Sequence, residues 1–218
     1  MTLFISIFGP DGSGKSTQAR ILAKHLVNRG LKVKLVWIKS RHTLAYIISR
    51  VFAKLSPRFL VLNPHGTIIR INAINNNPIG RLIWPWIEFM SILPLVILRV
   101  YLPLLMGYVI VAERYMVDSV VSIAYWLNDS NFLSSFIART MLRLIPKRSM
   151  LVYLYSDYEE IRRRRGNMAD PKDYVCFQKL AYNKLARMLG AIRIDTSQRS
   201  IEGTASAIRD HLKQAYGI

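Results

Sequence analysis

Short apolar segments of strand length alternate along this chain with segments in which apolar residues recur at helical spacing. The segments of strand length are residues 3–8, 33–38, 108–112, 150–155 and 191–194. Helical spacing is found at residues 15–29, 44–55, 81–106, 117–127, 131–144, 157–165, 174–189 and 201–215. Strands that alternate with helices pair in parallel, and helices cover both faces of the sheet. The pattern therefore predicts a three-layer α/β fold with a five-stranded parallel sheet.

Two parts of this pattern are less regular. Residues 58–80 carry turn signals around a short apolar piece, and no element is assigned to them. The helix predicted at 81–106 contains Pro94 and Pro103. We expect kinks at both positions, because proline lacks the N–H that a helix interior requires.

Residues 89–112 are almost wholly apolar, so they must be compared with a membrane span. A spanning helix takes about 20 uninterrupted apolar residues, whereas Arg99 lies in the middle of this segment and two prolines interrupt it. We therefore predict a buried helix followed by a buried strand. Peripheral contact with a membrane surface, helped by Trp84 and Trp86, is the alternative.

The length of 218 residues fits a single domain, residues 1–218. Cys176 is the only cysteine, which excludes a disulfide within the chain and a cysteine-based zinc cluster. The N-terminus leads directly into the first apolar strand without the features of a signal peptide. These observations together predict a cytoplasmic protein.

Basic residues outnumber acidic ones by 31 to 13, which gives a formal net charge of +18. The excess is greatest between residues 31 and 110, where Glu88 is the only acid. Such a surface attracts anions, and nucleotides or phosphorylated substrates are the simplest partners. Nucleic acid and an acidic membrane surface are the alternatives that charge alone leaves open.

The strongest motif is the segment 9–16, GPDGSGKS, which satisfies the phosphate-binding pattern G-x-x-x-x-G-K-[ST]. Its glycines allow successive N–H groups to point at phosphate oxygens. Lys15 would bridge the terminal phosphates of ATP, Ser16 would bind Mg²⁺, and the helix that follows presents its positive end to the same anion. The predicted ATP-binding residues here are Gly9, Asp11, Gly12, Ser13, Gly14, Lys15, Ser16 and Thr17.

A phosphate-binding loop does not by itself distinguish kinases from other nucleotide-binding proteins. The Asn-Lys-x-Asp motif that GTPases use to recognise guanine is absent from the sequence. Motor ATPases usually have longer chains than this one. A kinase is therefore favoured, and a nucleic-acid-associated ATPase, indicated only by the net charge, is the weaker alternative.

Four segments together resemble the thymidylate kinase family of nucleoside monophosphate kinases. They are FGPDGSGKSTQ at residues 8–18, VIVAERY at 109–115, the strand and arginine-rich helix at 151–166, and IDTSQ at 194–198. The segments keep the family order and span nearly the whole chain. The loop is specific to this family, whereas the other three carry weight only in combination.

The resemblance implies transfer of the γ-phosphoryl group of ATP to a nucleoside monophosphate, with Mg²⁺ and with dTMP as the preferred acceptor. It also implies a lid over the phosphates, at about residues 162–173. We further expect small-molecule nucleotide substrates, a homodimer and no nucleic-acid partner. A kinase for another phosphorylated acceptor, associated with a membrane surface, stays open as the main alternative.

The resemblance assigns roles to four residues at the ends of strands. Arg41 would grip the acceptor phosphate, and Asp11 would meet the sugar hydroxyl of the acceptor. Glu113 replaces the aspartate of the family and would organise the magnesium shell or the acceptor. Arg114 would reach the transferred phosphate. Alternatively, Arg41 is a solvated loop arginine and Asp11 orders its own loop. Glu113 and Arg114 would then form an ion pair at the end of the strand.

The run Arg162–Arg165 is the densest cluster of charge, and on a helix its four side chains point in different directions. Because Gly12 leaves the loop without an arginine of its own, lid arginines would have to supply positive charge during transfer. We predict Arg162 and Arg165 as the catalytic pair, with a solvated basic surface as the alternative. Thr196 is predicted to line the adenine site.

The acceptor base is the least certain element of the resemblance, because no base-reading arginine is in register on the central helix. Aromatic residues are present there, and we predict Trp86 or Phe89 as the platform on which the base stacks. After Tyr115, Asp118 and Ser119 stand where the family pattern is displaced. The identity of the acceptor base is therefore open.

Overall fold

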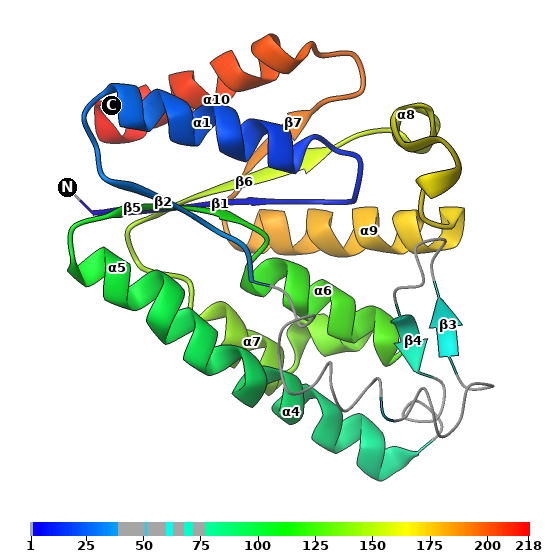
Figure 1. The fold of residues 1–218 in the computed structure, drawn as a ribbon. Coiled ribbons are helices and arrows are strands. Elements are labelled where there is room, and N and C mark those ends of the chain that lie inside the picture. The colour runs from blue at the N-terminus through cyan, green and yellow to red at the C-terminus, as the bar shows by residue number, and fades with distance from the viewer. Residues whose placement is uncertain (1, 39–50, 52–59, 63–67, 72–76) are drawn as a thin grey trace.

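The computed structural model describes residues 2–38, 51, 60–62, 68–71 and 77–218. Its main sheet has five parallel strands in the order β2-β5-β1-β6-β7 (Figure 1). The strands are β1 (Leu3–Phe8), β2 (Val33–Val36), β5 (Val109–Glu113), β6 (Ser149–Tyr155) and β7 (Ile192–Asp195). The predicted α/β fold with a five-stranded parallel sheet is confirmed.

The helices form the two outer layers. They are α1 (Lys15–Asn28), α4 (Pro78–Val96), α5 (Leu102–Leu105), α6 (Met116–Trp126), α7 (Phe136–Leu142), α8 (Tyr158–Arg165), α9 (Lys172–Met188) and α10 (Ile201–Tyr216). Helices α1 and α10 cover one face of the sheet, whereas α4 to α7 and α9 lie on the other (Figure 1). Helix α8 lies at the end of the sheet where β1 and β6 finish.

Alternate residues of the central strand β1 build the two cores. Ile5 and Ile7 pack with the apolar faces of α1 and α10, whereas Phe4 and Phe8 pack with α4, α6 and α9. Every residue of β1 is buried, as expected for a parallel strand that is covered on both faces. The register pairs Ile7 with Glu113, so the carboxyl ends of β1 and β5 meet at one edge.

The single helix predicted at 131–144 is wrong in detail, because the chain forms two shorter elements there. These are the 3₁₀ turn η4 (Ser130–Ser134) and α7 (Phe136–Leu142). Ser135 between them is extended, and its hydroxyl accepts from the N–H of Ala138 at 3.2 Å. A serine cap of this kind starts a new helix rather than continuing an old one.

The helix predicted at 81–106 begins earlier and changes its winding. Asn77 caps α4 by accepting from the N–H of Ile79 at 2.9 Å, and Pro78 occupies the first turn, where proline is well tolerated. A π-helical turn, η3 (Ile97–Tyr101), then connects α4 to α5. One helical rod therefore runs from Pro78 to Leu105.

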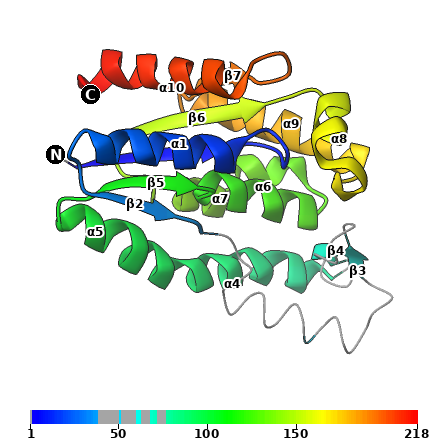
Figure 2. The same cartoon turned by 45° about the horizontal axis from the view of Figure 1, so that its top comes forward.

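The expectation that this rod is buried is only half correct. One face packs into the core through Trp84, Ile92, Val96 and Val100. The other carries exposed apolar side chains, here called the apolar stripe: Leu82, Trp86, Met90, Leu98, Leu102 and Leu105. Figures 1 and 2 show the rod along the outside of the molecule. The strand that follows, β5, has four fully buried residues, as predicted.

Sequence patterns gave no prediction for the antiparallel pair of β3 (Leu60–Leu62) and β4 (Ile68–Ile71). The helix predicted at 44–55 lies outside the described residues, apart from Val51. Arg41, predicted to hold the acceptor phosphate, also lies outside them.

Candidate active site

The phosphate-binding loop connects β1 to α1 and depends on its glycines. Gly9 has a φ of 143°, and a Cβ atom there would lie 2.0 Å from the carbonyl oxygen of Leu154 in β6. Gly12 has a φ of 91°, and a Cβ atom would meet the side chains of Arg165 and Ile161 at 3.0 and 3.1 Å. Both positions combine an unusual backbone angle with close neighbours, so only glycine fits.

The first turn of α1 is open to an anion. Its N-cap, Gly14, offers no side-chain hydrogen bond, and the turn contains no acidic residue. The backbone N–H groups and the positive end of the helix are therefore not neutralised by the chain itself. Lys15, Ser16 and Thr17 line a cavity of about 450 Å³ at this point. A polyphosphate fits this arrangement.

Lys15 is the buried cation of the loop, with 4% of its surface exposed. Its Nζ donates to the carbonyl of Pro10 at 2.6 Å and lies 3.4 Å from Oδ1 of Asp11. Burial lowers the pKa of Lys15 to about 8, while the carboxylates of Asp118 and Glu113 act in the opposite direction. The ammonium group therefore remains mostly charged at neutral pH and is held within the loop.

Ser16 and Glu113 provide oxygen atoms suited to a divalent cation. The hydroxyl of Ser16 donates to Oε1 of Glu113, although the two residues are 97 positions apart. Within the described residues, no group of three or more His, Cys, Asp or Glu side chains could hold a metal ion. Mg²⁺ typically takes one or two protein oxygens and completes its shell with waters and phosphates. The donor set therefore fits magnesium bound together with a nucleotide.

Arg114 is fixed by carboxylates on both sides. It follows β5 with a φ of 73°, an uncommon angle for a residue other than glycine. Its guanidinium pairs with Asp11 and also with Oδ1 of Asp118 at 3.3 Å. Asp118 accepts in addition from the N–H of Tyr115 at 3.2 Å and from the hydroxyl of Tyr182 at 2.9 Å. This network points the arginine into the cavity beside the loop.

Asp118 was not among the predicted site residues. It is 1% exposed and lies in the first turn of the otherwise apolar helix α6. An acid inside an apolar segment, five residues after the end of a strand, is the signal that would have indicated it. Such a buried charge is tolerated only when it is paired.

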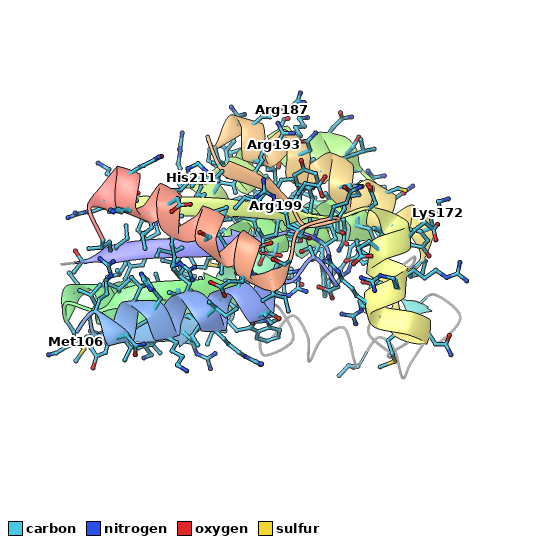
Figure 3. All side chains as sticks on the ribbon, turned by 90° about the horizontal axis from the view of Figure 1, so that it is seen from above. Met106, Lys172, Arg187, Arg193, Arg199 and His211 are labelled. Carbon is cyan, nitrogen blue, oxygen red and sulfur yellow. The ribbon has the colours of Figure 1, made fainter. Side chains whose placement is uncertain are left out.

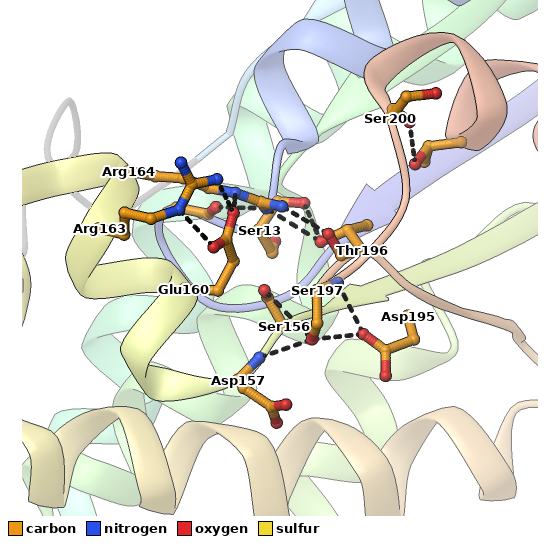
Figure 4. A network of polar contacts seen from close by, with 12 residues as sticks. Ser13, Ser156, Asp157, Glu160, Arg163, Arg164, Asp195, Thr196, Ser197 and Ser200 are labelled. Atoms are coloured by element: carbon orange, nitrogen blue, oxygen red, sulfur yellow. Dashed lines mark hydrogen bonds and ion pairs between the residues drawn. The ribbon is translucent and has the colours of Figure 1, made fainter.

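Arg164 connects helix α8 to the loop (Figure 4). Its guanidinium donates to the carbonyl of Gly12 at 3.2 Å and to both the hydroxyl and the carbonyl oxygen of Thr196. Glu160 accepts from Arg163 and Arg164, each at 2.7 Å. The hydrogen bond from Arg163 is the main reason why the pKa of Glu160 falls to about 2.

The four arginines of α8 point in different directions, as predicted. Arg165 lines the cavity beside the phosphate-binding loop together with Arg164. Arg162 instead lines a separate, open hollow with Glu159 and Gly166. The structure therefore brings Arg165 to the phosphate site but does not bring Arg162 there. Arg164, which was not in the predicted catalytic pair, takes that place.

A second cavity, of about 590 Å³, adjoins the first. The two share Gly14, Thr17 and Arg164. Gln18 of α1 and Thr196 after β7 also line the larger cavity. Its size and its position beside the loop suit a nucleoside, and Thr196, predicted to line an adenine site, is one of its lining residues.

The predicted base platform is not found at either cavity. Phe89 is buried in the core and Trp86 lies on the exposed stripe, with their rings 6.2 Å apart in an edge-to-face arrangement. Within the described part of the chain, neither residue lines the cavities beside the loop. Trp37, just after β2, does line the smaller one. Trp37 was not among the predicted site residues, although it lies at the carboxyl end of a parallel strand, where ligands bind in such sheets.

Comparison with known proteins supports the architecture. No protein-family model matches the chain, and no curated protein matches it. Among solved structures, thymidylate kinase from Candida albicans is similar with a TM-score of 0.58 and 18% sequence identity, over 98% of this chain and 91% of that one. At this identity the likeness shows the fold alone. The chain thus has the α/β fold of a P-loop kinase such as thymidylate kinase.

Proposed function

We propose that this protein is an ATP- and Mg²⁺-dependent kinase that phosphorylates a nucleoside monophosphate, with dTMP as the preferred acceptor. One observation carries the proposal: a single cavity is lined by the loop lysine, three arginines of other elements, and two carboxylates. These residues are Lys15, Arg114, Arg164, Arg165, Asp11 and Glu113. Phosphoryl transfer depends mainly on positioning and on neutralising charge, and this cavity offers groups for both.

Different parts of the chain would bind the phosphates, the nucleoside and the magnesium ion of ATP. The loop and the first turn of α1 would bind the phosphates, and the larger cavity would take the nucleoside. Ser16 and Glu113 would hold Mg²⁺, which supplies charge neutralisation at the phosphates when it is bound. Arg164, through Gly12 and Thr196, orients the loop and the wall of the nucleoside cavity together.

The acceptor would enter the smaller cavity from the side of β2 and β5. Arg114 would contact the acceptor phosphate, and Asp11 would accept a hydrogen bond from a sugar hydroxyl. Trp37 offers the aromatic surface nearest to these groups and replaces the platform predicted on α4. Arg41 lies outside the described residues and remains a predicted phosphate ligand.

The choice of dTMP rests on the resemblance in the loop and in the segment 109–115. Thymidylate kinase from Candida albicans, the structural neighbour, is described as having broad substrate specificity. A panel of acceptors is therefore the appropriate test. It contains dTMP, dUMP, UMP, CMP, AMP and GMP, with single-stranded DNA and no acceptor as further arms.

The measurement is ADP release with identification of the phosphorylated product. We expect release that depends on a nucleoside monophosphate, fastest with dTMP, and loss of release in Lys15→Ala. ATP hydrolysis that no monophosphate stimulates would overturn the kinase assignment. Hydrolysis stimulated by DNA instead would favour the nucleic-acid-associated ATPase.

A kinase for another phosphorylated small molecule is the second candidate. The observation that favours it is that, among the described residues, neither Trp86 nor Phe89 lines the two cavities beside the loop, where a base platform would be needed. To test this candidate, phosphorylated small molecules that lack a nucleobase are added to the panel of acceptors. Transfer to one of them that exceeds transfer to dTMP would replace the nucleotide acceptor.

A further inference from the structure

The apolar stripe runs along the outer face of one helical rod. Leu82, Trp86 and Met90 are spaced four residues apart, and Leu98, Leu102 and Leu105 continue the same side. The exposed fractions reach 71% at Leu82 and 86% at Leu105. Scattered exposed leucines are ordinary on protein surfaces, whereas a continuous apolar face of this kind indicates a partner.

The rod is long enough to make an extended contact. It covers 28 residues from Pro78 to Leu105 with a mean hydropathy of 1.8 in its most apolar window, of which 28% is buried. A helix of this length measures about 42 Å. By length and composition it could cross a bilayer. Whether it crosses a bilayer or lies on its surface depends on how the rod packs against the rest of the protein.

The surroundings favour a helix that lies on a bilayer rather than across it. The side opposite the stripe is packed into the core through Trp84, Ile92 and Val100, which are 3%, 1% and 0% exposed. The rod continues through a short turn into β5, which is hydrogen-bonded between β1 and β2. Lipid can therefore reach one side of the rod only.

The exposed charged residues of the rod are the arginines Arg81 and Arg99, and Asp129 of a neighbouring segment pairs with Arg81 at 3.4 Å near the N-terminal end of the rod. Glu88, the only acid between residues 31 and 110, is 1% exposed and lies on the core side. Arg99 is exposed within the π-helical turn, and its guanidinium donates to the carbonyl of Trp37 at 3.5 Å. The stripe thus carries no carboxylate that an anionic surface would repel.

Further cations flank the C-terminal half of the stripe. The hydroxyl of Tyr101 donates to the carbonyl of Leu144 at 3.1 Å, which places the turn with exposed Lys147 and Arg148 beside the rod. On the other side, the N–H of Val109, just after the rod, donates to the carbonyl of Lys32 at 2.7 Å.

We propose that the protein docks on an anionic bilayer surface through the apolar stripe. The leucines and Trp86 would enter the boundary between headgroups and acyl chains, and the flanking cations would meet lipid phosphates. A second copy of the chain is the less favourable occupant, because both partners would carry a net charge of +18. Figure 3 shows Met106, at the end of the rod, on the opposite side of the molecule from Lys172 near the lid. Docking is independent of the proposed reaction.

The test uses the full chain and vesicles of phosphatidylcholine, with and without phosphatidylglycerol. We expect cosedimentation with the anionic vesicles only. The double variant Leu98→Glu/Leu105→Glu should lose partitioning by about tenfold or more, because each leucine no longer buries apolar surface. The matched control is Leu180→Glu/Met188→Glu on α9, which changes two exposed apolar residues by the same charge and should keep wild-type partitioning.

A second measurement does not depend on charged variants. Brominated lipids should quench the fluorescence of Trp86, and this part of the quenching should disappear in Trp86→Phe, because Trp84 is buried and Trp37 and Trp126 are half-buried and lie outside the stripe. Equal partitioning of the stripe and control variants, or binding without quenching, would overturn the proposal. A vesicle-free dimer that the stripe variant converts to a monomer would also overturn it, since the stripe would then join two copies of the chain.

Discussion

Arg114 and Asp118 form a buried ion pair, with Nη1 and Oδ1 3.3 Å apart. Arg114 has 8% of its surface exposed and Asp118 has 1%. Asp118 does not line either cavity beside the loop within the described residues. Its effect on the reaction is therefore indirect, through Arg114 and through its charge near Lys15, which makes it a positioning residue.

We predict that Asp118→Asn lowers kcat/KM for the acceptor by about 10- to 100-fold, which corresponds to about 1.4–2.7 kcal/mol. The variant keeps the shape of the side chain but removes the charge that fixes Arg114. Steady-state kinetics with varied acceptor is the measurement. Tyr182→Phe, which removes only one hydrogen bond to Asp118, should have a smaller effect. A loss of thermal stability with unchanged kcat/KM would mean that Asp118 serves the fold alone.

Lys15→Ala and the closer isostere Lys15→Met are both expected to abolish transfer while the protein stays folded. Among the described residues, Nζ hydrogen-bonds to loop atoms of Pro10 and Asp11, and burial already disfavours its charge in the folded state. Transfer activity and the thermal unfolding midpoint should be measured together. A folded variant that retains more than about a tenth of the activity would contradict the role of Lys15, because that residue would then contribute less than about 1.4 kcal/mol to the barrier.

Single alanine variants of the four arginines in α8 should lower activity by unequal amounts. Arg165→Ala, which changes the phosphate cavity, should lower kcat on the order of a hundredfold with little change in ATP affinity. Arg164→Ala should also weaken ATP binding, because it removes the bonds to Gly12 and Thr196. Arg162→Ala is the control, since its side chain lines a separate hollow. Four equal and small losses would mean that the run is only a solvated basic surface.

Glu88 should make stability depend on pH. Its Oε1 is buried without a hydrogen-bond partner, and burial raises its pKa from 4.5 to about 8. The folded state therefore binds the proton more tightly than the unfolded state, so this stabilisation is complete below pH 4.5 and is lost as the pH rises through 8.

The measurement is the free energy of unfolding of wild type and Glu88→Gln from about pH 5 to about pH 9. Relative to the wild type, the free energy of unfolding of Glu88→Gln should increase by about 4 kcal/mol as the pH rises across this range. Glu202→Gln, an exposed residue paired with Arg209, should show no such trend. Parallel pH profiles for wild type and Glu88→Gln would show that the Glu88 carboxyl group is solvated in solution.

The sequence alone determined the fold class and the position of the phosphate-binding loop. Both depend on local information: an apolar strand, a glycine turn and an amphipathic helix lie within about 30 consecutive residues, and the three central strands β1, β5 and β6 are apolar on both faces. The boundaries of the 131–144 region were missed, because one serine cap outweighed the helical spacing on either side of it.

Only the tertiary structure decided which side chains meet. Ser16 and Glu113 lie 97 positions apart and come together through the pairing of β1 with β5. Asp118 and Tyr182 lie 64 positions apart and meet through the packing of α6 on α9. No local pattern encodes such pairs, since they depend on strand register and helix packing.

The same reason separates the arginines of α8 and the two faces of the long rod. Four consecutive arginines have the same local sequence, and only the direction from which α8 approaches the loop brings Arg164 and Arg165 to it rather than Arg162. The rod is apolar all round, so its hydrophobic pattern does not say which side is buried. The neighbouring helices determined that face: Trp84 packs beside Trp126 of α6 and Ile92 is buried in the same core, whereas Leu98 and Leu105 are left to the solvent.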